Sequence, residues 1–323
     1  MPNSRLGPGD LAALRSLDGH AGMSGASLLR GTLTDGRPVV VKHSTPRTDL
    51  FQSLLGHPVG LEYVLWESGV LSGLPAGIAT AVIGGWLDDD GGSTIVMDDL
   101  GASILGWGYT FTAVDARWFV ERVNDLHAAQ LRPSVSVTPL ENVVNTFAPS
   151  RIRTVDPAAV LLTDVERGWA AFRTLCPAAI ADAVTELVEH PGPLARALES
   201  RPSTFCHGDV AAVNMARQGD GLVLIDWGQA FIGPPVLDIV RFLPSGLRDS
   251  AVDRDWLLAE YAGVAGRRFD PVALRLALLA TLVWFGWSKA LDALEHPDPR
   301  RRADEVDGLA WWCARVADIT DLT

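Results

Sequence analysis

The sequence predicts an α+β protein in which a small antiparallel β-sheet with one main helix precedes a larger, mostly helical part. Two observations lead to this prediction. β-prone runs joined by turn residues occupy most of residues 1–98, and apolar residues at helical spacing dominate residues 99–323. With 323 residues and 48% hydrophobic content, the chain can bury a large core. We therefore expect two lobes, 1–98 and 99–323.

Two β-hairpins are predicted in the first lobe, each from two β-prone runs on either side of a turn. Asp35-Gly36 gives one of the turns, because Asp-Gly between β-prone runs is typical of a tight hairpin. Between the hairpins, residues 59–72 have apolar residues at helical spacing and predict the main helix. The four β-prone runs are residues 27–34, 38–42, 79–87 and 93–97.

Helices are predicted through most of the second lobe. Thr112 and Asp115 resemble a capping box at the start of the first helix, with Asp in place of the usual Glu. Residues 131–152 are rich in Pro, Ser and Asn and are expected to be irregular, and residues 203–225 form a strand-loop-hairpin unit. Further helices are expected over residues 164–175, 178–189, 253–262, 271–294 and 305–319.

Composition excludes several classes of protein. The 39 acidic and 27 basic residues give a net charge of −12, which argues against a nucleic-acid partner. Three cysteines lie far apart in the sequence, which excludes a disulfide framework and a Cys-x-x-Cys zinc site. The longest apolar run, residues 276–287, is shorter than the about 20 residues that span a bilayer, and no secretory signal is recognised. We expect a cytoplasmic protein with no membrane partner.

The second lobe carries one segment whose residues suggest phosphoryl transfer. Asp209 lies on a short loop five residues before Asn214, and a turn at residues 218–221 brings the chain back to Asp226. The hairpin is expected to bring Asn214 and Asp226 together, and their oxygens are ligands that Mg²⁺ accepts. Asp209 is then left to face the hydroxyl of an acceptor. A carboxylate base with metal ligands at this spacing is typical of kinase catalytic and metal loops.

These residues resemble a known family. His207-Gly-Asp-x-x-x-x-Asn214 followed by Ile225-Asp-Trp-Gly228 is similar to the signature of the aminoglycoside phosphotransferase/choline kinase group of small-molecule kinases, and Asp238 resembles the Asp that follows the metal loop there. The resemblance implies a bilobal protein-kinase-like fold and ATP (or GTP) with Mg²⁺ as cofactors. It implies that Asp209 is the catalytic base and that Asn214 and Asp226 bind the metal. His207 and His127 are expected to be structural.

The first lobe offers residues for the nucleotide phosphates. Lys42 ends a Val-Val-Val-Lys strand, as the phosphate-binding lysine of kinases does, and it is one of only two lysines in a chain rich in arginine. By the same resemblance Glu62 is expected to pair with Lys42, with Glu67 as the alternative. Ser24 and Gly25 lie in a loop of small residues, where backbone N–H groups can approach phosphate oxygens.

The segment that leaves the last predicted strand of the first lobe is expected to be the hinge between the lobes. It contains Met97, Asp98 and Leu100. In the family that the chain resembles, backbone groups at this position hydrogen-bond the adenine. The sequence therefore predicts a nucleotide-binding lobe over residues 1–98, and a catalytic and acceptor-binding lobe over residues 99–323.

The expected function is O-phosphorylation of a small molecule. An antibiotic is the leading acceptor, because scattered carboxylates of the second lobe could attract a cationic compound. A metabolic sugar, choline or amino-alcohol kinase is the alternative, and a nucleotide-binding pseudokinase is disfavoured because Lys42, Asp209, Asn214 and Asp226 are all present. Whether the protein is a monomer or a homodimer stays open. The carboxylates are Asp249, Asp253, Asp255, Glu260, Asp292 and Glu295.

Clustered aromatic residues near the C-terminus have two interpretations. Packing in the core is favoured over stacking on a flat acceptor, because large apolar side chains are usually buried. The residues are Trp284, Phe285, Trp287, Trp311 and Trp312.

Overall fold

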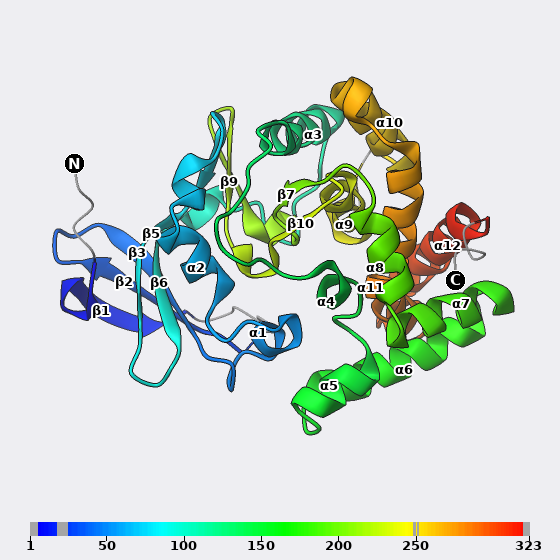
Figure 1. The fold of residues 1–323 in the computed structure, drawn as a ribbon, viewed down its shortest axis with the longest axis horizontal. Helices are drawn as coiled ribbons and strands as arrows, with labels where there is room; N and C mark the ends of the chain where they lie inside the picture. The colour runs from blue at the N-terminus through cyan, green and yellow to red at the C-terminus, as the bar shows by residue number, and fades with distance from the viewer. Residues whose placement is uncertain (1–5, 18–24, 248–249, 251, 319–323) are drawn as a thin grey trace.

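The computed structural model describes residues 6–17, 25–247, 250 and 252–318. An antiparallel sheet of five strands, in the order β1-β2-β3-β6-β5, forms the first part of the chain (Figure 1). Val39 and Val41 are buried on one face of β3, so the alternation along a strand turns Lys42 to the opposite face, toward the helices. The strands are β1 (Leu11–Ser16), β2 (Ser27–Leu33), β3 (Pro38–Ser44), β5 (Val82–Leu87) and β6 (Ser93–Asp98).

Two helices, where the sequence predicted one, connect β3 to the rest of the sheet. The predicted helix over 59–72 is shorter, because α2 (Leu61–Glu67) ends before Gly69, whose φ of +81° is left-handed. A 3₁₀ turn over Val70–Gly73 follows. The additional helix α1 (Leu50–Leu55) is capped by the side chain of Asp49, which accepts a hydrogen bond from Gln52 N.

The larger part of the chain is helical, as predicted. Thr112 and Asp115 form the expected capping box at the start of α3. The long helix α11 lies at the centre and packs against several other helices, α6, α9 and α12 among them (Figure 1). The predicted helices are observed as α3 (Ala113–Ala128), α6 (Val160–Leu175), α7 (Ala178–Glu189), α10 (Arg254–Ala265), α11 (Pro271–Glu295) and α12 (Pro299–Val316).

Several short helices were missed. The region 131–152, expected to be irregular, contains α4 (Leu140–Val144) and the start of α5 (Pro149–Val155). Pro191-Gly-Pro193 follows the end of one helix and also starts α8 (Gly192–Glu199), because proline is well tolerated in a first helical turn. The missed helix α9 (Val236–Gly246) carries Asp238 in its first turn.

Short strands connect the two parts of the chain. The predicted run 79–87 is two strands, and β4 (Ile78–Thr80) pairs in parallel with β9 (Gly221–Leu224). β9 in turn pairs with β8 (Met215–Gln218) in the predicted hairpin. A strand from the first 98 residues therefore completes the sheet that carries Asn214 and Asp226. The remaining strands, β7 (Thr204–Cys206) and β10 (Phe231–Gly233), pair with each other.

Helix α11 is the one described helix that is long and apolar enough, by length and composition, to cross a membrane. Of its most apolar window, 67% is buried inside the protein, which is typical of a core helix. The three cysteines are buried free thiols, in agreement with the exclusion of a disulfide framework.

Candidate active site

The loop after β7 is held by one buried carboxylate. The Oδ2 of Asp238 accepts from His207 N at 2.9 Å, and its Oδ1 accepts from Gly208 N at 2.8 Å. Gly208 has a φ of +86°, and a Cβ there would lie 2.2 Å from the carbonyl oxygen of Gln229. Only glycine fits this position, because the conformation is left-handed and backbone occupies the space. The glycine of the His207-Gly-Asp209 segment is therefore required by the local backbone geometry.

His207 supports the loop through both nitrogens of its ring. Its Nε2 lies 3.0 Å from the carbonyl oxygen of Ile225, and its Nδ1 accepts from Asp209 N at 3.2 Å. These contacts require the neutral tautomer with the proton on Nε2. Burial lowers the pKa of His207, which favours the neutral ring. The expected structural role of His207 agrees with these contacts.

Asp209 lies half-buried at the end of this loop, next to Asn214. The Nδ2 of Asn214 donates to Asp209 Oδ2 at 2.9 Å and to Asp209 O at 3.0 Å. Burial, and then the negative charge of Asp226, raise the pKa of Asp209 to about 7. A carboxyl group with this pKa can accept a proton at neutral pH more readily than an ordinary aspartate.

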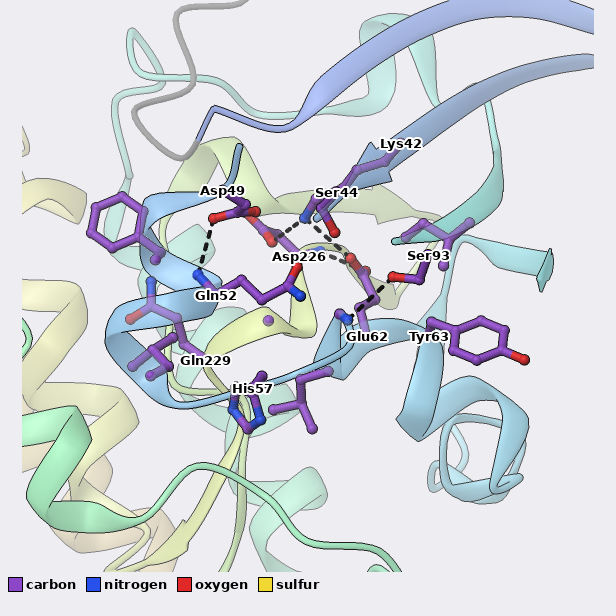
Figure 2. A pocket seen from close by; sticks show the side chains of 16 residues that line it. Lys42, Ser44, Asp49, Gln52, His57, Glu62, Tyr63, Ser93, Asp226 and Gln229 are labelled. Atoms are coloured by element: carbon purple, nitrogen blue, oxygen red, sulfur yellow. Dashed lines mark hydrogen bonds and ion pairs between the residues drawn. The ribbon is translucent and has the colours of Figure 1, made fainter. Parts of the chain in front are cut away.

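Lys42, Glu62 and Asp226 meet where the two parts of the chain face each other (Figure 2). Lys42 Nζ lies 2.6 Å from Asp226 Oδ1 and 3.4 Å from Glu62 Oε2. Burial opposes the charge of Lys42, but the carboxylates of Asp226 and Glu62 outweigh it and raise its pKa. The structure thus places Glu62 against Lys42, whereas Glu67 is exposed at the end of α2.

Asp226 is held in an unusual backbone conformation. Its φ of 65° is left-handed, and its N–H donates to Glu62 Oε1 at 2.9 Å. Non-glycine residues rarely adopt this region, and a cost of about 1–3 kcal/mol must be offset by surrounding contacts. Glu62 therefore positions both the ammonium group of Lys42 and the backbone of Asp226.

The hairpin brings the two predicted metal ligands to its open end. Ile225 N donates to Asn214 O at 3.0 Å, so Asp226 follows directly beside Asn214. Because Asn214 donates through Nδ2, its amide oxygen is the atom that a cation can take. An amide oxygen and a carboxylate suit Mg²⁺, and a cation here would relieve the repulsion between Asp209 and Asp226. The donor set fits the predicted ion.

The predicted hinge lies at the end of β6. Met97 is buried within the sheet, and the N–H of Asp98 donates to the carbonyl oxygen of Ala81 at 2.9 Å. Asp98 also pairs with Arg37 at 2.6 Å. The N–H of Leu100 has no partner among the described residues. Of the three, Leu100 has the backbone donor that remains available to a ligand.

The predicted phosphate-covering loop is described only at its end. Ser24 lies outside the described residues, so its placement is not addressed. Gly25 is exposed and has a φ of +86°, and a Cβ there would lie 1.9 Å from the carbonyl oxygen of Thr48. Gly25 is therefore needed for close packing against the turn that precedes α1.

The structure adds a residue that sequence reasoning missed. Arg241, one turn after Asp238 on α9, donates to the carbonyl oxygen of Gly208, and its guanidinium lies 3.5 Å from the ring centroid of Trp284. Burial lowers its pKa to about 10, against the attraction of Asp209. An arginine among apolar residues, in Ile239-Val-Arg-Phe-Leu243, was the signal available in the sequence.

A small pocket is lined by Lys42 and Asp226 (Figure 2). Asp49 and Gln52 line it from α1, and Gln229 lines it from the chain after Asp226. Burial raises the pKa of Asp49. Both amide atoms of Gln52 are buried without a partner among the described residues. Sequence reasoning missed Asp49 and Gln52, because α1 itself was not predicted.

The aromatic cluster packs in the core, as favoured. Trp284, Trp287 and Trp312 are buried, and Phe285 and Trp311 are half-buried against them. Stacking on an acceptor therefore has no support for the three buried rings.

The chain matches a family model in sequence and solved structures in fold. The model of the phosphotransferase enzyme family matches residues 112–277. No curated protein matches the chain. The fold is similar to that of wild-type aminoglycoside 2'-phosphotransferase-IIIa bound to GDP, with 16% identity, a TM-score of 0.53, and 94% of this chain and 93% of that chain covered. It is also similar to a mutant of that enzyme bound to GDP, with 15% identity, a TM-score of 0.54, and 96% and 94% of the chains covered.

Proposed function

Since this chain belongs to the phosphotransferase enzyme family and is a small-molecule kinase, we propose that it moves the terminal phosphoryl group of ATP or GTP to an acceptor hydroxyl, with Asp209 as the base. One observation carries the proposal. Asp209, with a pKa raised to about 7, lies beside Asn214 and within the electrostatic influence of Asp226 and Lys42. A base, two oxygen ligands and a cation are the parts that phosphoryl transfer needs.

In the proposed mechanism, Asp209 orients the acceptor hydroxyl and takes its proton. Asn214 holds the carboxylate through a hydrogen bond of 2.9 Å, which fixes its direction. Mg²⁺, held by Asn214 and Asp226, would neutralise charge on the phosphates. Because the transition state is loose, most of the acceleration should come from positioning and charge neutralisation.

Lys42 is proposed to hold the nucleotide phosphates. Its pKa is raised, so the ammonium group stays protonated at neutral pH. Glu62 keeps the group in place at 3.4 Å. The N–H of Leu100 is proposed to hydrogen-bond the base of the nucleotide. In this proposal residues 1–98 bind the nucleotide and residues 99–323 carry the base and the acceptor site.

An antibiotic is the proposed acceptor, in line with the aminoglycoside phosphotransferase that shares the fold. The carboxylates that suggested attraction of a cation give little support, because most already have partners. Asp253 caps α10, and Asp255, Glu260 and Glu295 pair with Arg315, Arg117 and Arg167. Asp249 lies outside the described residues. We propose resistance or self-protection in the cytoplasm as the role, with a metabolic sugar or amino-alcohol kinase as the alternative.

The test is release of ADP or GDP by the purified protein with Mg²⁺ and a panel of hydroxylated antibiotics, sugars and amino alcohols. Acceptor-dependent release that disappears with EDTA and in Asp209→Asn would support the proposal and identify the acceptor class. Asp220→Asn, an exposed carboxylate in the turn between β8 and β9, serves as the matched control. Nucleotide binding without release for any acceptor would favour a pseudokinase instead.

A further inference from the structure

A second cavity, of about 560 Å³, lies in the helical part of the chain and shares no lining residue with the pocket at Lys42. Its walls come from α3, from the segment before β7 and from residues 261–271 of α10 and the following turn. Cavities of roughly 300–1,000 Å³ are the size that binds small molecules. The proposed reaction uses none of the groups at its surface.

His127 carries an unpaired polar atom in the wall of this cavity. Its Nε2 lies 3.0 Å from Asp238 Oδ2, and its Nδ1 is buried without a partner among the described residues. The side chain is 4% exposed. Because a carboxylate only accepts, Nε2 carries a proton, and in the tautomer with that single proton Nδ1 is an acceptor. A ligand with a hydroxyl donor would satisfy an atom whose burial otherwise costs about 1–3 kcal/mol.

The remaining groups of the cavity favour an anion with an apolar body. Arg267 and Arg268 are exposed at its edge. Asp270, the one acidic residue of the lining, already accepts from Arg201 Nε at 2.8 Å and caps α11. Tyr261 and Phe269 supply aromatic surface, with ring centroids 6.4 Å apart.

We propose that this cavity binds a small hydroxylated aromatic acid. Its carboxylate pairs with Arg267 and Arg268, its ring lies against Tyr261 and Phe269, and its hydroxyl donates to His127 Nδ1. Each part of the ligand is complementary to a group of the cavity. The carboxylate matches two cations at the edge, the ring matches two aromatic rings in the wall, and the hydroxyl matches one buried acceptor.

The ligand also acts on the loop that carries Asp209, and this part rests on the proposed function. The carboxylate that His127 contacts holds the N–H groups of His207 and Gly208. A ligand that fixes the imidazole therefore favours one arrangement of Asp238 and of the loop. Its preference for that arrangement sets the largest shift in the population of the loop that it can cause, and couplings of this kind are typically about 5–150-fold.

The test is calorimetric titration of the full chain with 6-hydroxy-2-naphthoate. Saturable binding at one site is expected, at least about tenfold weaker for 6-hydroxy-2-naphthamide, which lacks the charge, and for the double variant R267A/R268A. Arg300→Ala, which removes an exposed arginine outside the cavity, should bind as the wild type does. Absence of binding at about millimolar acid, or equal binding by wild type and R267A/R268A, would overturn the site.

A second comparison isolates His127. The wild type should prefer 6-hydroxy-2-naphthoate to 2-naphthoate, and His127→Gln should lose that preference, because glutamine keeps a donor for Asp238 but has no atom equivalent to Nδ1. An unchanged preference in His127→Gln would overturn the hydroxyl contact. Binding that leaves acceptor phosphorylation unchanged would overturn the coupling. Calorimetry needs no catalysis, so an inactive protein that binds the acid would contradict the proposed function and leave the site standing.

Discussion

Replacing Asp209 by asparagine should stabilise the nucleotide-free protein at neutral pH, although it removes the proposed base. Burial and the charge of Asp226 raise the pKa of Asp209 from 3.8 to about 7. The two values differ by about 3 pH units, and each pH unit corresponds to about 1.4 kcal/mol. The ionised carboxylate therefore costs the folded state up to about 4 kcal/mol, and about 2 kcal/mol if solvent reaches its exposed side.

The sign follows from the two protonation states. Below about pH 4 the carboxyl group is protonated in both the folded and the unfolded chain, so it costs nothing. Between about pH 4 and 7 the unfolded chain ionises first, and the folded state loses stability as the pH rises. Asparagine cannot ionise. The stability advantage of Asp209→Asn should therefore grow across this interval and stay constant above it.

The measurement is urea unfolding of wild type and Asp209→Asn at several pH values from about 4 to 8, without nucleotide or Mg²⁺. Asp220→Asn is the control, because this exposed carboxylate lies outside the site. A difference in unfolding free energy between wild type and Asp209→Asn that is flat with pH would refute the reasoning. So would a difference that falls as the pH rises.

Three further changes test the support of the site. Glu62→Gln should raise the KM for nucleotide about tenfold in steady-state kinetics, because it weakens the contacts with Lys42 and with the backbone of Asp226. Glu67→Gln should match the wild type. Equal effects of the two substitutions would contradict Glu62 as the partner of Lys42. Asp238→Asn should lower the free energy of unfolding by about 2–4 kcal/mol and kcat by at least about tenfold, because a carboxylate oxygen that accepts a loop N–H becomes an NH₂ group. A variant with the Tm and the activity of the wild type would contradict the role of Asp238. Gly208→Ala should lower both the activity and the stability more than Gly219→Ala does, because both glycines have a positive φ but only at Gly208 would a Cβ lie against backbone. Calorimetric unfolding and turnover measure the two effects. Equal losses in the two variants would refute the steric argument.

The residues that carry the proposed chemistry were readable from sequence because they are close together along the chain. Asp209, Asn214 and Asp226 lie on one loop and one hairpin, so turn signals and spacing were enough to predict that they meet. The helix and strand types were predictable where periodicity was long, as in α3 and α11. Short helices such as α4 and α5 were not, because five to seven residues give too few turns for a period to appear.

The residues that hold the site were not predictable in the same way. Asp238 was recognised only by its resemblance to a family residue, and Arg241 was missed. Both reach the loop from α9, some thirty positions along the chain, and their contacts with its backbone leave no trace in the sequence. Asp49 and Gln52 face the site only because α1 folds against it. Likewise the pairing of β4 with β9 joins two parts of the chain that share no local signal.

The sequence alone therefore determined the family and the types of the longer elements, and it predicted which residues act as the base, the two metal ligands and the phosphate-binding lysine. Those features depend on side-chain chemistry and on spacing within short segments. The tertiary structure decided which glutamate meets Lys42, how Asp226 reaches a φ of 65°, and why the pKa of Asp209 is raised to about 7. Each of these depends on burial and on charges brought together from distant segments, and such proximity exists only once the chain has folded.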